Sequence, residues 1–301
     1  MIPSDKREQH SLIADNTICI QSELATLRRL TNMITFYDTH AHLDYPDYAE
    51  DLPGVIARAQ AAGITKIISI GTDLESSARA IKLSEEYPGV FAAVGWHPTN
   101  AYTAPEDLRP ALRELARHPK VVAIGETGLD YYRLPSQQPG GNVADDEPYK
   151  QKQALIFNQQ IEVAAEFGLN CVIHTRSSLE DTLTQMQPFT GRVRGVFHCF
   201  VDGPAAMERI LNMNSLVSFT GIVTFKNAQL VRETVAAVPL RKFMLETDSP
   251  YLAPVPYRGK RCEPGYVKEI SEFVAQVKGC SLEELSQATC AAAAEFFPKL
   301  K

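Results

Sequence analysis

The sequence predicts an α/β protein built as a single-domain (β/α)8 barrel, the TIM-barrel architecture. Eight short apolar segments recur along the chain, and stretches with helical periodicity separate them. Most of these segments are nearly continuous in hydrophobicity and rich in Val, Ile and Phe, as expected of parallel strands buried on both faces. Their total span fits the roughly 250 residues that this architecture usually takes. An open, doubly wound sheet would show the same alternation and is the alternative.

The predicted strands are Phe36–Asp38, Ile64–Ile70, Val90–Trp96, Val121–Ile124, Leu169–Ile173, Val193–Phe197, Leu216–Phe219 and Phe243–Leu245. Helical patterns between them include Leu52–Ala62, Pro105–Arg117, Lys150–Phe167, Pro204–Met213 and Val231–Val238. The segment from Ser281 to Phe297 is expected to form a closing helix, in which Ser281 and Glu284 make a capping box.

Two regions lie outside this alternation. Residues 1–32 precede the first strand and are interpreted as an N-terminal extension to a barrel that covers residues 33–301. Residues 134–147 include a Gly-Gly pair and a run of acidic side chains, so they are predicted to form a flexible insertion beside the barrel mouth.

Composition excludes several classes of protein. The chain has 301 residues, with 30 Lys plus Arg against 36 Asp plus Glu, which gives a net charge of −6. No apolar run approaches the ~20 residues of a membrane-spanning helix, and the polar first ten residues do not resemble a secretory signal. The 6 cysteines include no CxxC pair, which indicates reduced thiols and a cytoplasmic location. The acidic balance argues against a wide basic surface for nucleic acid.

Ionisable side chains follow six of the predicted strands. His40 and His42 follow the first strand, His97 the third, Glu126 the fourth, His174 the fifth, His198 the sixth and Asp248 the eighth. Because the carboxyl ends of barrel strands meet on one face, where active sites of this architecture are built, these side chains are expected to gather there.

Four of these histidines and the two carboxylates are a suitable ligand set for two divalent metals. We expect His40, His42 and Asp248 on one ion, His174 and His198 on the other, and the carboxylate of Glu126 between them. Each ion then keeps positions open for water or substrate, which is typical of catalytic metals. Asp248 is the candidate general base. A single histidine at a strand end would more often be a structural residue, but four in equivalent places favour a metal site.

The motifs around these residues resemble the TatD family of metal-dependent deoxyribonucleases, a branch of the amidohydrolase-type barrels. The matching stretches are DTHAHLD (38–44), IGTD (70–73), VGWHP (94–98), IGETGLDYY (124–132), IHTR (173–176), FHCF (197–200), SFTG (218–221), ETDSPYLAP (246–254) and RGKRCEP (258–264). The resemblance places His40, His42, Glu126, His174, His198 and Asp248 on the family's metal-ligand positions. It implies hydrolysis of DNA phosphodiester bonds from a 3′ end, with Mg, Mn or Zn as the two metal ions. Thr127, Cys262 and Ala292 depart from the family's usual residues.

Four further residues are candidates for substrate binding: His97, Arg176, Arg258 and Tyr131. The guanidinium groups suit phosphate, His97 could donate to a phosphate or leaving group, and Tyr131 could stack on a base. Salt bridges or packing would explain the same side chains without any ligand. Single-stranded DNA or a DNA 3′ end is the expected partner, and no membrane or obligate protein partner is indicated.

The same metal pair would also serve other reactions. A small-molecule amidohydrolase or lactonase, and a deacylase that acts on D-aminoacyl-tRNA, are the alternative functions. A binding protein without catalytic activity fits less well, because open metal positions would have no use in it.

Overall fold

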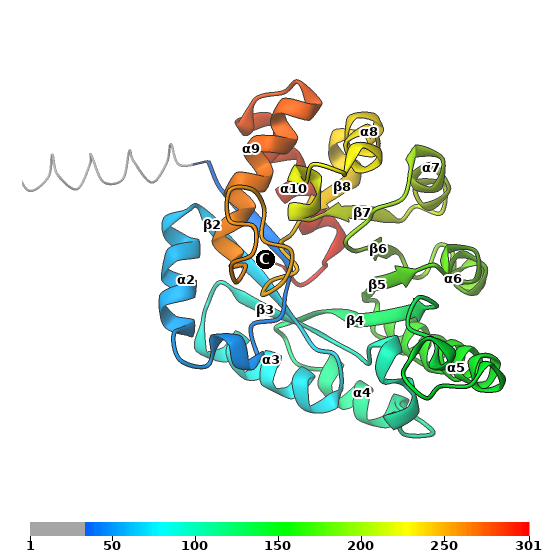
Figure 1. Cartoon of the computed structure of the whole chain (residues 1–301). Coiled ribbons are helices and arrows are strands. Elements are labelled where there is room, and N and C mark those ends of the chain that lie inside the picture. Colours follow the sequence, from blue (N-terminus) through cyan, green and yellow to red (C-terminus); the bar gives the residue numbers. More distant parts are fainter. Residues whose placement is uncertain (1–33, 301) are drawn as a thin grey trace, which may run out of the picture. The chain divides into compact units, whose positions relative to one another are not determined.

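The eight predicted strands form one parallel sheet in the order β1 to β8, with helices on its outer side (Figure 1). The computed structural model describes residues 34–300, so the predicted extension 1–32 lies outside the described residues. The strands are β1 (Phe36–Ala41), β2 (Ile64–Ile70), β3 (Val90–Val94), β4 (Val121–Asp130), β5 (Asn170–Arg176), β6 (Gly195–Phe197), β7 (Leu216–Phe219) and β8 (Phe243–Leu245).

The α-helices are α2 (Leu52–Ala61), α3 (Leu74–Glu86), α4 (Arg109–Ala116), α5 (Asp146–Phe167), α6 (Leu179–Met186), α7 (Pro204–Asn212), α8 (Gln229–Ala237), α9 (Val267–Lys278) and α10 (Leu282–Phe296). Short 3-10 helices are η1 (Pro46–Tyr48), η2 (Pro98–Thr103), η3 (Pro135–Gln137), η4 (Val143–Asp145), η5 (Gln187–Phe189), η6 (Gly221–Thr224), η7 (Leu240–Lys242) and η8 (Pro264–Tyr266). Within the described residues, no helix is both long and apolar enough to cross a bilayer.

Backbone hydrogen bonds join the first and last strands and close the barrel. The Asp248 amide donates to the carbonyl of His40 over 2.9 Å, and the His42 amide donates to the carbonyl of Ser249 over 2.8 Å. The open-sheet alternative is therefore wrong. These hydrogen bonds lie beyond the end of β8. They hold the segment with the predicted ligands His40 and His42 next to the segment with Asp248.

The C-terminal segment covers one end of the barrel. Ala293, Phe296, Phe297 and Leu300 join a buried cluster with side chains from the strands, such as Ile68, Val122, Val172 and Met244. Lys66 in β2 and Asn170 at the start of β5 donate to the carbonyls of Leu300 and Phe296. These contacts place the segment near the amino ends of the strands, which leaves the opposite end free for a site. The predicted capping box of Ser281 and Glu284 is present in α10.

Several predicted boundaries differ from the structure. β3 ends at Val94 rather than at Trp96, and β4 continues to Asp130 instead of ending at Ile124. The extra residues of β4 pair with β5, with Thr127 opposite Ile173 and Asp130 opposite Arg176. The insertion 134–147 contains η3 and η4, and its last two residues already belong to α5.

Candidate metal centre

The six predicted metal ligands come together at the carboxyl ends of the strands. His40 lies in β1, Glu126 in β4 and His174 in β5. His42 and His198 directly follow β1 and β6, and Asp248 lies three residues beyond the end of β8. All except the fully buried His40 line one cavity of about 560 Å³. The fold thus assembles the site from five strands that are far apart in the sequence.

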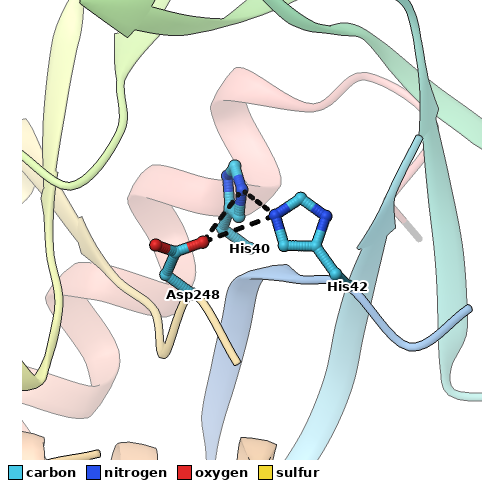
Figure 2. A group of neighbouring side chains, drawn as sticks. All are labelled: His40, His42 and Asp248. Atoms are coloured by element: carbon cyan, nitrogen blue, oxygen red, sulfur yellow. Dashed lines mark hydrogen bonds and ion pairs between the residues drawn. The ribbon is translucent and has the colours of Figure 1, made fainter. Parts of the chain in front are cut away.

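His40, His42 and Asp248 form the first cluster (Figure 2). The Nε2 atoms of the two imidazoles lie 3.3 Å apart, and Oδ1 of Asp248 is 3.6 Å from the first and 3.4 Å from the second. Nδ1 of His42 lies 3.2 Å from the carbonyl oxygen of Ile70, to which it can only donate. In the neutral imidazole, Nε2 of His42 therefore carries the lone pair and points it into the cluster.

Glu126 lies between the first cluster and the remaining histidines. Its Oε2 is 3.4 Å from Nε2 of His40 and 3.7 Å from Nε2 of His42. Its Oε1 is 2.8 Å from Nε2 of His198 and 2.9 Å from Nδ1 of His174. The two oxygens of one carboxylate thus face two different sets of imidazole nitrogens, which is the arrangement that a bridging ligand requires.

Asp130 fixes the orientation of His174. Its Oδ2 lies 3.1 Å from Nε2 of His174, so in the neutral imidazole this nitrogen carries the proton and Nδ1 presents a lone pair toward Glu126. Oδ1 of Asp130 accepts from the amides of Tyr132 and Arg133. Asp130 was not among the residues predicted from the sequence. The only signal was its position in the GLDYY stretch, four residues beyond Glu126.

His97 lies against Glu126 as well, at 3.1 Å between Nε2 and Oε1. Its Nδ1 accepts from the backbone amide of Thr99, which leaves the proton on Nε2. Although the distances alone would admit His97 as a metal ligand together with Glu126 and His174, this proton makes it a hydrogen-bond donor instead.

Electrostatics at the site favour an ionised Glu126 and positively charged His42 and His174, whereas burial and the neighbouring His198 lower the pKa of His40 to about 4. Burial raises the pKa of Glu126, but the neighbouring His198, His97 and His174 outweigh it and hold the pKa well below its usual range. Burial lowers the pKa of His174, but the hydrogen bonds with Asp130 and Glu126 raise it to about 9. The pKa of His42 also rises to about 9, because the Asp248 and Glu126 carboxylates outweigh burial. The metal-free site therefore attracts positive charge.

Two buried carboxyl groups hold the backbone next to the predicted metal ligands His40 and His198. Glu246, which follows β8, accepts the Cys199 amide through Oε1 over 2.6 Å, and the same oxygen lies 3.8 Å from Nδ1 of His198. Asp38 accepts the amides of His40 and Thr247 through Oδ1. Burial raises the pKa of Asp38 to about 8 and that of Glu246 to about 7. Both hold the backbone that carries a ligand.

The predicted substrate-binding residues divide into two groups. His97 and Arg176 line the cavity. Tyr131 and Arg258 do not: the Tyr131 hydroxyl donates to Asp181 over 2.8 Å outside the cavity, and the guanidinium of Arg258 stacks over Phe225 at 3.8 Å. These two side chains lie outside the cavity, because each has a protein partner that holds it there, and their role in substrate binding stays a prediction. No residue of the insertion 134–147 lines the cavity either.

Tyr45, Tyr251 and Arg133 also line the cavity, although their sequence context did not predict it. Tyr45 stacks on the ring of His42 at 4.7 Å between centroids, and its edge meets Tyr251. Arg133 adds a second guanidinium to that of Arg176 at the cavity wall. Tyr45 and Tyr251 each lie three residues beyond a predicted ligand, but the sequence does not show which way a loop side chain points.

Comparison with known proteins agrees with this geometry. The sequence matches the TatD-related DNase family over residues 37–298, which is most of the chain. The chain belongs to this family. A relative from Bacillus subtilis (strain 168), named an uncharacterized metal-dependent hydrolase, YabD, is 39% identical over 262 residues that cover 87% of this chain and 98% of YabD.

Two further relatives extend the comparison of this TatD-related protein. One from Klebsiella pneumoniae (strain 342), named 3′-5′ ssDNA/RNA exonuclease TatD, is 31% identical over 81% of this chain and 90% of its own. The crystal structure of YJJV, a TatD homolog from Escherichia coli K12, has a TM-score of 0.80 and 27% identity, and covers 88% of this chain and 99% of that one. The TatD-related protein is a metal-dependent hydrolase with a TIM-barrel fold.

The donor set of the TatD-related protein fits a divalent cation. Nε2 of His42 and Nδ1 of His174 present lone pairs toward ionised carboxylate oxygens, an approach that is unfavourable unless a proton or a cation lies between them. Neutral imidazole and carboxylate together suit Zn²⁺ and Mn²⁺, and the carboxylates suit Mg²⁺. The residues present can therefore hold the metal on which the hydrolase depends.

Proposed function

We propose that this protein is a phosphodiesterase that removes nucleotides from the 3′ end of single-stranded DNA, using two divalent cations. One observation carries the proposal: a single cavity is lined by five of the six predicted metal ligands and by two guanidinium groups, Arg133 and Arg176. The Klebsiella pneumoniae relative, named a 3′-5′ ssDNA/RNA exonuclease, supports both the substrate and the direction.

Two ligand sets would hold the cations. His40, His42 and Asp248 would hold one, His174 and His198 the other, and Glu126 would contribute one oxygen to each side. When bound, such cations stabilise negative charge on phosphoryl oxygens and make water a stronger acid. Asp38, Asp130 and Glu246 would keep the ligands in place, because each accepts hydrogen bonds from a ligand or from backbone next to one.

Asp248 is the proposed general base. Its Oδ1 faces His40 and His42, whereas Oδ2 has no hydrogen-bond or ion-pair partner among residues 34–300. Burial raises the pKa of Asp248, but the hydrogen bond with His42 and the charges of His40 and His198 have the larger effect. The pKa is therefore lowered, and the carboxylate is ionised at neutral pH. Oδ2 can then accept a proton from the attacking water.

Arg133 and Arg176 are the proposed phosphate ligands. Both are exposed, and in the described part of the chain neither has a carboxylate within salt-bridge distance. Arg176 is held by Tyr132, whose ring centroid lies 3.8 Å from the guanidinium carbon. By contrast, Arg261, which lies in the loop after β8, binds Asp51 and Glu263. Guanidinium groups without an internal partner are suited to bind phosphate oxygens in pairs.

His97 is the proposed proton donor. Its Nε2 proton points at Oε1 of Glu126 inside the cavity, which also places it near any phosphate held between the clusters. The net charge of −6 agrees with action at the end of a DNA strand, since binding along a duplex needs many cationic contacts. The five described cysteines are free, which supports a cytoplasmic location.

The proposal is tested with a 5′-labelled single-stranded DNA oligonucleotide, purified protein and Mg²⁺ or Mn²⁺. We expect a ladder that shortens from the 3′ end and disappears with EDTA or in Glu126→Gln. Glu208→Gln, at an exposed residue of α7 outside the cavity, is the matched control and should retain activity.

An intact oligonucleotide with every metal tried would overturn the proposal. Cleavage of amides or lactones by the same preparation would then identify a small-molecule hydrolase. Release of an amino acid from D-aminoacyl-tRNA would identify a deacylase. An equivalent RNA oligonucleotide in a parallel reaction shows whether the enzyme distinguishes the two sugars.

A further inference from the structure

The metal-bearing cavity has two chemically different sides. Its cations, Arg133 and Arg176, come from the loop after β4 and from the end of β5. The loops after β6, β7 and β8 instead contribute apolar side chains: Val201, Ile222, Tyr251 and Leu252. We call these four residues the apolar wall. Val201 is 46% exposed and Tyr251 is 54% exposed, so the wall presents hydrophobic surface to the open cavity.

The apolar wall is directly connected to the proposed metal ligands. Val201 follows His198 by three residues, and Tyr251 follows Asp248 by three. The Tyr251 amide donates to the Asp248 carbonyl over 3.0 Å, so a single tight turn links the general base to the wall. Any group that contacts the wall is therefore next to the reacting centre.

The backbone under the wall is held in an unusual conformation. Leu252 has φ +56°, a region that costs energy for a bulky side chain and that is found where surrounding contacts impose it. Gly221 in η6 makes this possible, because a Cβ there would lie 2.2 Å from the carbonyl oxygen of Leu252.

Side-chain hydrogen bonds brace the same two loops. The Thr224 hydroxyl donates to the Gly221 carbonyl over 2.7 Å and accepts the Val255 amide over 2.9 Å. These contacts keep η6 against the segment after β8, so the wall exists before a ligand arrives. A preformed apolar surface lowers the cost of ordering on binding.

We propose that the apolar wall holds the base of the nucleotide that is being released, while Arg133 and Arg176 hold phosphate on the other side of the cavity. This inference rests on the proposed function. A nucleobase is the flat, weakly polar part of a nucleotide, and contact with apolar and aromatic side chains stabilises it whatever its identity. Val201, Ile222 and Leu252 have no polar side-chain atoms to read a base edge. The enzyme then requires a base at the 3′ end and discriminates little among the four.

Two oligonucleotides test this inference. They are identical except at the 3′-terminal nucleotide, which carries a base in one and hydrogen at C1′ (a tetrahydrofuran residue) in the other. We expect wild-type kcat/KM to be about tenfold or more higher for the base-bearing strand, as for other apolar pocket contacts. In Leu252→Ala and in Val201→Ala, kcat/KM for the base-bearing strand should fall by roughly tenfold and that for the abasic strand should barely change.

Leu230→Ala is the matched control. Leu230 is 49% exposed on α8 but does not line the cavity, so its truncation should leave the ratio of the two substrates unchanged. Equal kcat/KM for both strands in the wild type would overturn the inference. So would an equal loss on both strands in both wall variants, since a merely structural wall affects every substrate alike. Failure to cleave either strand would overturn the proposed function and this inference together.

Discussion

Replacing Asp130 with asparagine should weaken metal binding without disturbing the fold. Oδ1 of Asp130 accepts the Tyr132 and Arg133 amides, and an asparagine Oδ1 can accept both in the same way. Oδ2 faces Nε2 of His174 at 3.1 Å, and the amide group that would replace it can only donate. His174 must then accept at Nε2 and carry its proton on Nδ1, the atom that faces Glu126. That tautomer has no lone pair for a cation.

The size of the effect follows from the kind of bond that is lost. Hydrogen bonds stabilise the ionised Asp130 carboxylate, whose pKa is lowered by His174 although burial raises it. A hydrogen bond to a charged group contributes about 1.5–3 kcal/mol. With about 1.4 kcal/mol for each factor of ten, the metal dissociation constant should rise roughly 10- to 150-fold. This matches the loss of about 10- to 100-fold seen when groups behind a metal ligand are changed.

Isothermal titration calorimetry with Mn²⁺ measures this change directly, and the metal dependence of oligonucleotide cleavage gives a second readout. Saturating Mn²⁺ should restore part of the activity of Asp130→Asn. Asp181→Asn is the control, because that carboxylate accepts the Tyr131 hydroxyl outside the cavity. An unchanged dissociation constant in a correctly folded Asp130→Asn protein would refute the reasoning about the His174 tautomer.

Three further predictions follow from the same geometry. Arg176→Ala should raise KM for an oligonucleotide about tenfold and reduce the salt dependence of binding, whereas Arg258→Ala should do neither; steady-state kinetics at several salt concentrations compares them. Metal binding near neutral pH should release protons, because His42 and His174 have pKa values of about 9 without metal and must deprotonate to bind it. Affinity should therefore fall as pH falls, and calorimetry in buffers of different ionisation enthalpy counts the protons. Gly221→Ala should lower the free energy of unfolding by about 1–3 kcal/mol through the clash with Leu252, whereas Gly54→Ala in α2 should not; chemical denaturation measures both.

The strand ends made it predictable that these six side chains gather in one place. Each of the six residues lies in a strand or within three residues of its carboxyl end, and a parallel barrel brings all carboxyl ends of its strands to one face. Periodicity and hydrophobicity are local properties of the sequence, so they were sufficient for the barrel, for the closing helix and for the positions of these ligands.

Asp130 was missed because β4 does not end where its apolar run ends. Residues 126–130 look like a loop by composition, yet they continue the strand because they pair with β5 and are buried on every side. This partner lies more than forty residues further along the chain. Tertiary pairing decided the strand boundary, and no local pattern reports it.

The surface residues were harder to predict for a related reason. Tyr131 and Arg258 were chosen for their chemistry, but Asp181 and Phe225 hold them away from the cavity. The direction of a loop side chain depends on contacts with residues that are distant in the sequence. Arg133 and Tyr251 line the cavity for the same reason, although nothing near them in the sequence distinguishes them from their neighbours.

The central claim is that two cations and the 3′ end of a DNA strand bind in one cavity. Anomalous diffraction measured at the Mn absorption edge tests it most directly. The crystals would contain Mn²⁺ and a short phosphorothioate oligonucleotide. We predict two peaks, one among His40, His42 and Asp248 and one beside His174 and His198, with Glu126 between them. The 3′-terminal phosphate group should lie between these peaks and the guanidinium groups of Arg133 and Arg176. A single peak, no peak, or a strand bound outside the cavity would contradict the account.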